Sequence, residues 1–320
     1  MSLVANPTHP ETKPPRTDYG TLTVDPLTPV IGAEVRGIDL SQQLSNQQLD
    51  DIHQTFTDHS VLVFREQQLD REAHKRFARH FGPLHVHPLN RGGREDDPEI
   101  LRVKTTKNSK FTAGDGWHTD VTCDEKPPLG SMLYMTETPE IGGGDTLFSS
   151  MYAAYEALSP TMQAFLEPLT AVHDGARPYQ GNYNYAPVDG EAHPKSEHPV
   201  IGVHPHSGRR VLYVNAGFTT RIKGLTATES EAILQMLFRH IESGVRFQCR
   251  VLGPQHAGVL GQPLHPASRR LGLLPLQPLW RAGLDHRRAA GRRRGLSARP
   301  DIRGLGVEPD TYAPDGDEVR

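Results

Sequence analysis

The patterned part of the chain begins with short apolar segments separated by turn-forming residues. Residues 21–40, TLTVDPLTPVIGAEVRGIDL, carry β-branched residues between bends at Gly32 and Gly37, which predicts short strands. The segment SVLVFRE at 60–66 is largely apolar and predicts a buried strand. Farther along, VLYVNAGFTTRI at 211–222 predicts another strand followed by a turn.

Helical spacing of apolar residues appears between these segments. The predicted helix starts share a capping side chain, alone or with a partner residue: Ser45 with Gln48, Asp70, Ser159 with Pro160, and Thr228 with Glu231. The last of these helices has a predicted buried face made of large aliphatic and aromatic residues: Ile233, Leu234, Leu237, Phe238 and Ile241. Strands with peripheral helices, and no regular βαβ alternation, predict a mostly β, jelly-roll-like core with flanking helices.

The composition divides the chain into three parts. Residues 1–19 are polar and Pro-rich, which predicts a disordered lead. Residues 20–250 form one predicted domain. Residues 251–320 contain no Phe, Lys or Asn and only one Tyr, while Arg, Gly, Pro, Leu and Ala dominate. Such a tail is poor in strand-forming residues, so the last core strands are expected to be missing or distorted.

Charge and cysteine usage exclude several classes of partner. The net charge of −3 gives no reason to expect nucleic acid or an acidic membrane. Two cysteines, Cys123 and Cys249, cannot form a disulfide framework. The sequence shows neither a run long and apolar enough to span a bilayer nor a secretory leader. These features predict a cytoplasmic protein and leave room for a homo-oligomer.

The segment GDGWHTDVT contains the main candidate for chemistry. His118 and Asp120 are two residues apart, and on a strand such residues point to the same face. An imidazole and a carboxylate there suit Fe(II) in a 2-His-1-carboxylate site, which leaves positions open for a 2-oxo acid and dioxygen. The alternative is an ordinary loop histidine that hydrogen-bonds to a neighbouring acid.

Several longer segments give this short motif a context. They share similarity with one family and include FGPLHVHP, WHTDVT, PPLGSMLYMTETPEIGGGDTLFSSMYAAYEALS, HPVIGVHPHSGRRVLYVNAGFTTRI and LFRHI. Through them residues 22–250 resemble the taurine dioxygenase (TauD/TfdA) family. The resemblance implies a double-stranded β-helix and an enzyme that uses Fe(II), 2-oxoglutarate and O2. Such an enzyme hydroxylates a C–H bond of a small organic acid and releases succinate and CO2.

The resemblance also implies roles for individual residues. His118 and Asp120 match the first two iron ligands, and Thr146 matches the hydroxyl that binds a 2-oxoglutarate carboxylate. His87 resembles the family's substrate-contacting histidine; the alternative is a loop histidine with satisfied hydrogen bonds. The glycines at 142–144 would permit a close approach or simply form a turn.

The walls of the implied pocket have a second interpretation as well. Val121, Phe218 and Tyr179 match wall positions, although ordinary core packing accounts for such residues equally well. Arg221 could hold an anion, but a surface or structural arginine is the simpler reading.

Three positions depart from the pattern of members that select taurine. Asn90 replaces a tyrosine, Gly114 replaces an asparagine, and Cys123 replaces a phenylalanine. Loss of a phenol and an amide removes hydrogen bonds that would recognise the amine and the sulfonate of taurine. The departures argue against taurine itself and leave another sulfonate, a sulfate ester or an aryloxy acid.

The tail lacks two further residues that the resemblance implies. A distal histidine in a W-D-N-R-x-T-Q-H segment is expected near residue 268, followed by an arginine that pairs with 2-oxoglutarate. Neither is present, and neither His265 nor His286 has surroundings that support assigning it as the ligand. Codons compatible with the tail, read one nucleotide later, permit a string that includes WDNRCTQH. We therefore interpret the sequence after Arg250 as frameshifted, the alternative being a divergent tail.

Three functions follow from these observations. The first is an Fe(II)- and 2-oxoglutarate-dependent dioxygenase that acts on a sulfonate or sulfate ester. The second is a catalytically impaired relic of such an enzyme, because the distal histidine and the arginine are absent. The third is a zinc hydrolase that uses His118 and Asp120, which the family motifs disfavour.

Overall fold

The structure is a computed structural model. It describes eight stretches of the chain, namely 16–91, 97–104, 116–137, 145–181, 192–243, 248–251, 256–261 and 265–267. Two compact units divide the chain after Trp280, and every described residue belongs to the first. Most of the predicted N-terminal lead and most of the predicted tail therefore lie outside the described residues.

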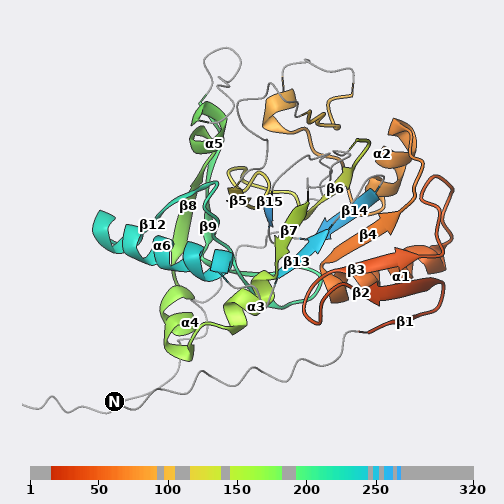
Figure 1. The fold of residues 1–320 in the computed structure, drawn as a ribbon. Coiled ribbons are helices and arrows are strands. Elements are labelled where there is room, and N and C mark those ends of the chain that lie inside the picture. Colours follow the sequence, from red (N-terminus) through yellow and green to blue (C-terminus); the bar gives the residue numbers. More distant parts are fainter. Residues whose placement is uncertain are drawn as a thin grey trace, which may run out of the picture. The chain divides into compact units, whose positions relative to one another are not determined.

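The first half of the chain contributes most of a six-stranded sheet (Figure 1). Its strands, in spatial order, are β1 (Asp18–Tyr19), β2 (Leu22–Pro26), β3 (Ala33–Arg36), β4 (Val61–Arg65), β14 (His256–Gly261) and β6 (Gly130–Tyr134). All neighbours are antiparallel except β3 and β4. This arrangement confirms the short strands expected between residues 21 and 66.

Helices α1 (Asn46–His59) and α2 (Arg71–Arg79) add side chains to the core of this sheet. Ile52 and Phe56 of α1 and Phe77 of α2 share a buried cluster with Leu62 and Phe64 of β4. The predicted starts of both helices are confirmed, because Ser45 and Gln48 form a capping box and Asp70 caps α2.

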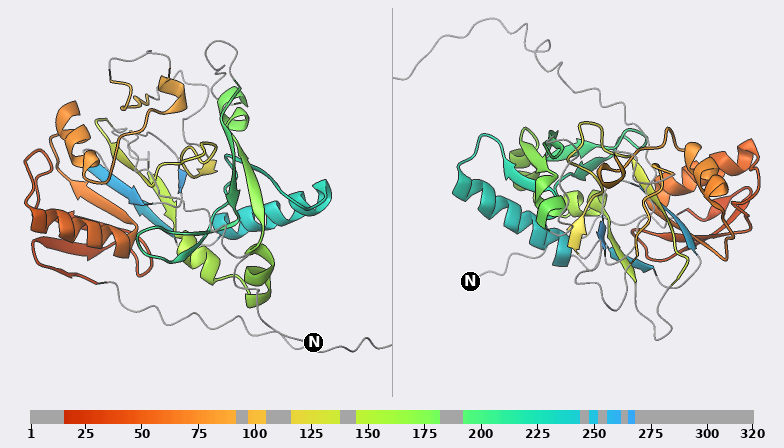
Figure 2. Two further views of the ribbon diagram at one scale, coloured as in Figure 1. Left: turned by 180° about the vertical axis from the view of Figure 1, so that it is seen from behind. Right: turned by 90° about the horizontal axis from the view of Figure 1, so that it is seen from above.

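A four-stranded sheet carries the central motif. Its spatial order is β13 (Gln248–Val251), β7 (Thr146–Ser149), β15 (His265–Ala267) and β5 (Gly116–His118). Figure 2 shows these strands from behind and from above. The backbone of β15 pairs with both neighbours: His265 lies opposite His118, and Ala267 lies opposite Gly116 and Thr146.

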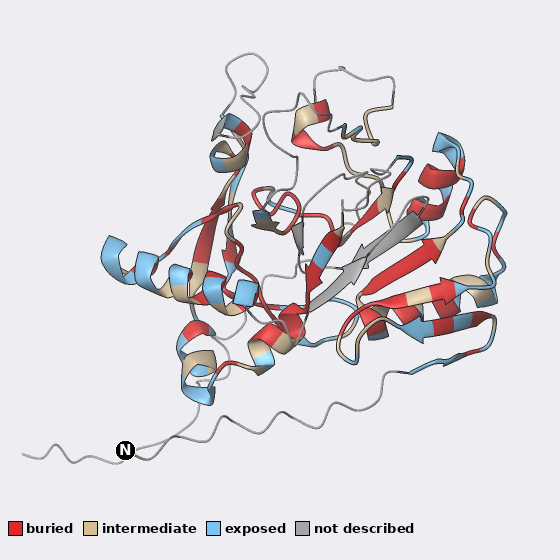
Figure 3. Cartoon of the chain, viewed as in Figure 1, coloured by how far each residue is buried: buried red, intermediate tan, exposed pale blue. Residues whose placement is uncertain are grey.

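The remaining described elements are a three-stranded sheet, a two-stranded hairpin and several helices. The strands are β12 (Thr219–Ile222), β8 (Thr170–Asp174) and β9 (Lys195–Pro199) in one sheet, and β10 (Ile201–Val203) with β11 (Arg210–Leu212) in a hairpin. The helices are η1 (Pro88–Asn90), α3 (Met151–Glu156), α4 (Pro160–Leu166), α5 (Ala176–Gly181) and α6 (Ala227–Ser243). Buried residues occupy the centre of β8 and one face of α6 (Figure 3).

Helix α6 begins at Ala227, and its capping residue Thr226 lies two residues before the predicted cap Thr228. Thr226, rather than Thr228, accepts the backbone N–H of Glu229, and the Glu229 carboxylate accepts the Thr226 N–H. Both Thr-x-x-Glu pairs satisfy the capping pattern, so the pattern alone could not choose between them. The predicted buried face is confirmed for Leu234, Leu237, Phe238 and Ile241, whereas Ile233 is only partly buried.

The last core strands, expected to be missing or distorted, are not all missing, because three short segments from residue 248 onward take part in the sheets. The backbones of β13, β14 and β15 all pair within the sheets, and β14 fills the position between β4 and β6. The hydrogen bonds between strands use backbone N–H and C=O groups. A segment of poor strand propensity can therefore still lie between two strands whose backbone groups require hydrogen-bond partners. Within the described part of the chain, no helix is long and apolar enough to cross a membrane.

Candidate active site

His118 and Asp120 meet at the end of β5. The strand ends at His118, and Asp120 lies in the turn that follows, so the two do not share one strand as the motif predicted. Nevertheless His118 Nε2 lies 3.3 Å from Asp120 Oδ1. Two neighbouring ligands of one ion, each about 2.1 Å from it, would be about 3 Å apart. The distance therefore suits two adjacent ligands of a single metal ion.

The other ring nitrogen of His118 is already engaged. His118 Nδ1 lies 2.8 Å from the carbonyl oxygen of Gly116, to which it can donate a hydrogen bond. That bond places the proton of the neutral ring on Nδ1 and leaves the lone pair of Nε2 directed at Asp120. Burial acts to lower the pKa of His118, but the hydrogen bond and charge of Asp120 raise it above its ordinary value. A cation thus has a favourable place between the two side chains.

The turn that carries Asp120 has an unusual backbone. Val121 is buried and has a φ of 52°, in the left-handed region that β-branched residues rarely occupy. Ser131 of β6 donates a hydrogen bond of 2.5 Å to Asp120 Oδ2, and the pair is buried. A residue of the six-stranded sheet therefore holds the carboxylate of Asp120, whereas the backbone of Asp120 continues from a strand of the four-stranded sheet.

Gly217 packs directly against His118. A Cβ at Gly217 would lie 2.7 Å from the Cβ of His118, a separation that real Cβ atoms essentially never show. The Gly217 N–H also donates to the carbonyl oxygen of Trp117, at 3.1 Å. Sequence reasoning missed both Gly217 and Ser131, because neither belongs to the HxD motif and their partners are distant in sequence.

The predicted pocket-wall residues gather beside this pair. Val121, Cys123, Tyr179 and Phe218 form one buried apolar cluster, with Leu89 packed against it. The ring of Tyr179 meets Phe218 edge-on, at a centroid distance of 5.9 Å. The structure therefore brings the predicted wall residues together, although their burial is equally what core packing requires.

His87 faces this cluster and is neutral. Its ring meets Tyr179 edge-on at 5.7 Å, and its Nδ1 accepts the backbone N–H of Leu89 at 3.1 Å. Burial lowers the pKa of His87 to about 3, although the Asp120 carboxylate acts in the opposite direction. The ring proton must then sit on Nε2, which makes His87 a potential hydrogen-bond donor to a neighbouring acceptor.

Thr146 lies on the same sheet as His118 but not next to it. It is buried at the start of β7, and β15 separates β7 from β5. Two strand spacings correspond to roughly 10 Å between β7 and β5. The glycines at 142–144, expected to shape the approach to Thr146, lie outside the described residues.

Other predicted positions are not assembled into the site. Arg221 is exposed on β12, in agreement with its reading as a surface arginine. Asn90 is buried, and its amide donates to the carbonyl oxygens of Pro98 and Ile100, at 3.2 and 3.0 Å. Gly114 and the side chain of His265 lie outside what the structure describes. Among the described residues, no group of three His, Cys, Asp or Glu side chains is placed to hold a metal.

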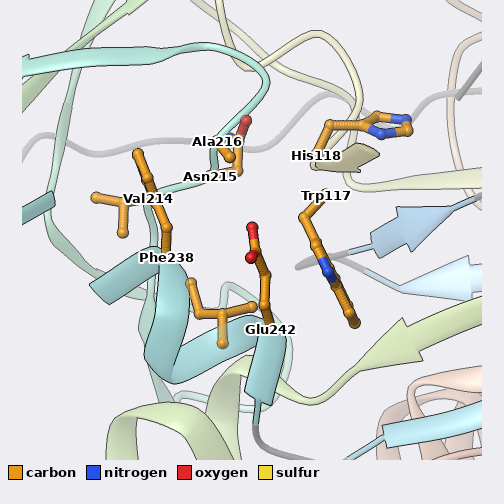
Figure 4. Close-up of a pocket in the computed structure, with 8 residues that line it drawn as sticks. Trp117, His118, Val214, Asn215, Ala216, Phe238 and Glu242 are labelled. Atoms are coloured by element: carbon orange, nitrogen blue, oxygen red, sulfur yellow. The ribbon is translucent and has the colours of Figure 1, made fainter. Parts of the chain in front are cut away.

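A small pocket lies beside β5. Trp117, Phe238 and Glu242 are among its lining residues, and Figure 4 shows the imidazole of His118 turned away from Glu242. Burial raises the pKa of Glu242. His118 also lines this pocket, although its imidazole is directed away from Glu242.

Known proteins resemble the chain in sequence. The sequence profile described as "Taurine catabolism dioxygenase TauD, TfdA family" matches residues 23–252. The alpha-ketoglutarate-dependent dioxygenase cnsP of Penicillium expansum is 36% identical over 240 residues, which cover 70% of this chain and 64% of that protein. The alpha-ketoglutarate-dependent sulfonate dioxygenase of Saccharomyces cerevisiae is 32% identical over 254 residues, which cover 76% and 61%. The chain spans less than two thirds of the length of these two relatives.

A solved structure also resembles the fold. The crystal structure of a taurine dioxygenase from Burkholderia xenovorans aligns with a TM-score of 0.67 and 31% sequence identity. The alignment covers 81% of this chain and 92% of that one. The similarity confirms the predicted jelly-roll fold.

Proposed function

Because the chain belongs to the TauD/TfdA family of taurine catabolism dioxygenases, we propose that it is an Fe(II)- and 2-oxoglutarate-dependent dioxygenase of a small organic acid. The proposal rests on one observation: His118 Nε2 and Asp120 Oδ1 lie 3.3 Å apart at a buried turn, a separation suited to one metal ion. His118 and Asp120 would hold Fe(II), which with 2-oxoglutarate and O2 supplies the oxidant for hydroxylating a C–H bond.

The protein's own residues hold and orient the reactants. Gly116 fixes the imidazole of His118, so that Nε2 stays available as a ligand. Thr146 would offer its hydroxyl to a carboxylate of 2-oxoglutarate. His87, neutral and protonated on Nε2, would donate a hydrogen bond to an acidic oxygen of the substrate. The cluster of Val121 and Phe218 would exclude water from the reacting carbon.

The substrate that these residues suit is a sulfonate or sulfate ester with an apolar body. Asn90 stands where taurine-selective members have tyrosine, and its amide is occupied by two backbone carbonyls. The wall beside His87 is apolar and includes Cys123, whose thiol pKa burial raises, so the thiol stays uncharged. A sulfonate also matches the substrate class for which the yeast relative is named. Hydroxylation of the carbon next to the sulfonate or ester oxygen would let sulfite or sulfate leave, with an aldehyde as the second product.

The second candidate function is a catalytically impaired dioxygenase, and the number of metal ligands favours it. The described side chains supply only two ligands of the expected three. The family profile ends at residue 252, two residues beyond Arg250, where the composition changes. In the reading shifted by one nucleotide, the histidine of TQH takes the place of Ala267, whose backbone lies opposite Gly116 and Thr146. This position supports the proposal that the tail is read out of frame.

Succinate release from 2-oxoglutarate tests both candidates. It should be measured with Fe(II) over a panel of sulfonates, sulfate esters and aryloxyacetates, for this chain and for one whose tail follows the shifted reading. We expect the shifted chain to turn over at least one sulfonate or sulfate ester, and this chain to be much slower. Absence of substrate-dependent succinate from both chains would contradict the dioxygenase proposal. Equal rates would contradict only the impaired candidate.

A further inference from the structure

The two oxygens of Asp120 have different partners. Oδ1 lies 3.3 Å from His118 Nε2, whereas Oδ2 accepts the hydroxyl of Ser131 at 2.5 Å. Ser131 is buried on β6, a strand of the six-stranded sheet, and its hydroxyl reaches the turn that follows β5 of the other sheet. We propose that Ser131 is a positioning residue for the metal site: it holds Oδ2 so that Oδ1 faces the imidazole. The inference rests on the proposed metal-binding function of His118 and Asp120.

The local backbone explains why such a hold is needed. Asp120 lies in the turn beyond the last ladder pair of β5, not in the strand itself. Its neighbour Val121 has a φ of 52°, a conformation that the surroundings must maintain. The terminal torsion of an aspartate is broad, so the carboxylate can turn unless a partner restrains it.

The chemistry of the contact suits this role. A hydroxyl that donates to an ionised carboxylate forms a short, charge-assisted bond, stronger than one between neutral groups. A serine hydroxyl has a single proton, so the bond to Oδ2 uses its whole donor capacity. Groups that orient a ligand in this way usually change metal affinity by about 10- to 100-fold when they are removed.

The contact also couples the site to β14. Ser131 lies opposite Leu260 in the pairing of β6 with β14. The position of the Ser131 backbone, and with it the carboxylate of Asp120, therefore depends on a strand that begins after Arg250.

Co(II) binding by the full chain tests the proposal, with Co(II) absorption as the probe. We expect Ser131→Ala to weaken Co(II) binding at least about tenfold and to shift the Co(II) absorption bands, because the freed Oδ2 can change how the carboxylate binds. Ser131→Thr, which keeps the hydroxyl, should restore both. The matched control is Ser149→Ala, since Ser149 is buried on β7 and its hydroxyl has no hydrogen-bond partner among the described residues. That variant should bind Co(II) like the unaltered chain.

Three results would overturn the proposal. One is an unchanged affinity and spectrum for Ser131→Ala. Another is a loss of affinity with unchanged bands that merely follows a lower unfolding temperature of the metal-free protein, which a structural role would produce. The third is no Co(II) binding by the unaltered chain. That third result would also count against the proposed metal site, whereas the first two would leave that site standing.

Discussion

Each ligand of the candidate site is held by a neighbour that forms no part of the HxD motif. The Gly116 carbonyl orients His118, the Ser131 hydroxyl holds Asp120, and Gly217 allows a backbone to lie against the imidazole. The two-residue spacing indicated the ligands, but not their supports. Gly116 lies on the same strand as His118, whereas Ser131 and Gly217 come from segments that only the folded chain brings next to the motif.

Gly217→Ala should disturb the site through overpacking. Its Cβ would lie 2.7 Å from that of His118 and 3.6 Å from the His118 Cα, so a strand residue rather than a flexible tip must move. We expect a loss of about 1–3 kcal/mol in the free energy of unfolding, with weaker Fe(II) binding. Urea denaturation and metal titration would measure the two effects.

Gly20→Ala provides the control for that substitution. A Cβ there would meet only the Asp51 carboxylate oxygen, at an ordinary 3.6 Å. Equal effects of the two substitutions would contradict the special role assigned to Gly217.

Buried neutral histidines should make the fold acid-sensitive. Burial lowers the pKa of His74 to about 4, and that of His87 and His173 to about 3. An unfolded chain binds these protons below about pH 6.5, whereas the folded chain binds them only near its own lower pKa. Stability is therefore fully present above pH 6.5 and falls as the pH drops toward 4.

His74→Leu isolates one of these contributions away from the site. His74 Nε2 is buried without a hydrogen-bond partner among the described residues, so an apolar replacement removes a buried polar atom that forms no hydrogen bond there. The slope of unfolding free energy against pH between 6 and 4 should fall by about 1 kcal/mol per pH unit. Urea titrations at several pH values would show it, and an unchanged slope would contradict the burial argument.

At the scale of elements, the sequence predicted that a helix exists better than it predicted the residue at which the helix begins. Capping side chains and apolar spacing located α1 and α2, because a cap and its first turn are local in the chain. They misplaced the start of α6 because two Thr-x-x-Glu pairs overlap there. The order of strands in the sheets could not be predicted, since β14 pairs with β4 and β6, which are both far from it in the sequence.

Paired substitutions can verify the start of α6. Thr226→Ala removes the side chain that accepts the Glu229 N–H, and should cost about 1 kcal/mol of unfolding free energy. Thr228→Ala lies inside the helix, where alanine is at least as favourable, and should be neutral or slightly stabilising. Thermal or urea unfolding would separate the two, and a larger cost at Thr228 would restore the original prediction.

At the scale of the whole molecule, the family and its chemistry were accessible from sequence because several long segments carry the resemblance. The third metal ligand could not be identified from sequence, because the composition changes at Arg250, before the segment that should supply this ligand. The register of β15 adds what sequence could not provide. It places Ala267, the position of the histidine in the shifted reading, opposite Gly116 on the site's own sheet.

Ala267→His tests the proposed frame without rebuilding the tail. Opposite residues of an antiparallel pair share a face, and residues two apart on a strand do so as well, so position 267 shares a face with position 118. We expect the substitution to tighten Co(II) binding at least tenfold, whereas Pro266→His, one residue away on the other face, should not. Equal effects of both substitutions would contradict the inferred register.

Anaerobic Fe(II) binding is the most direct test of the central claim that His118 and Asp120 hold the metal. Equilibrium titrations should compare the unaltered chain with His118→Ala and Asp120→Ala, each verified by its metal-free unfolding temperature. The account predicts one weakly bound Fe(II) per chain, and at least a tenfold loss of affinity in each variant. Fe(II) binding that is unchanged in both variants would contradict it.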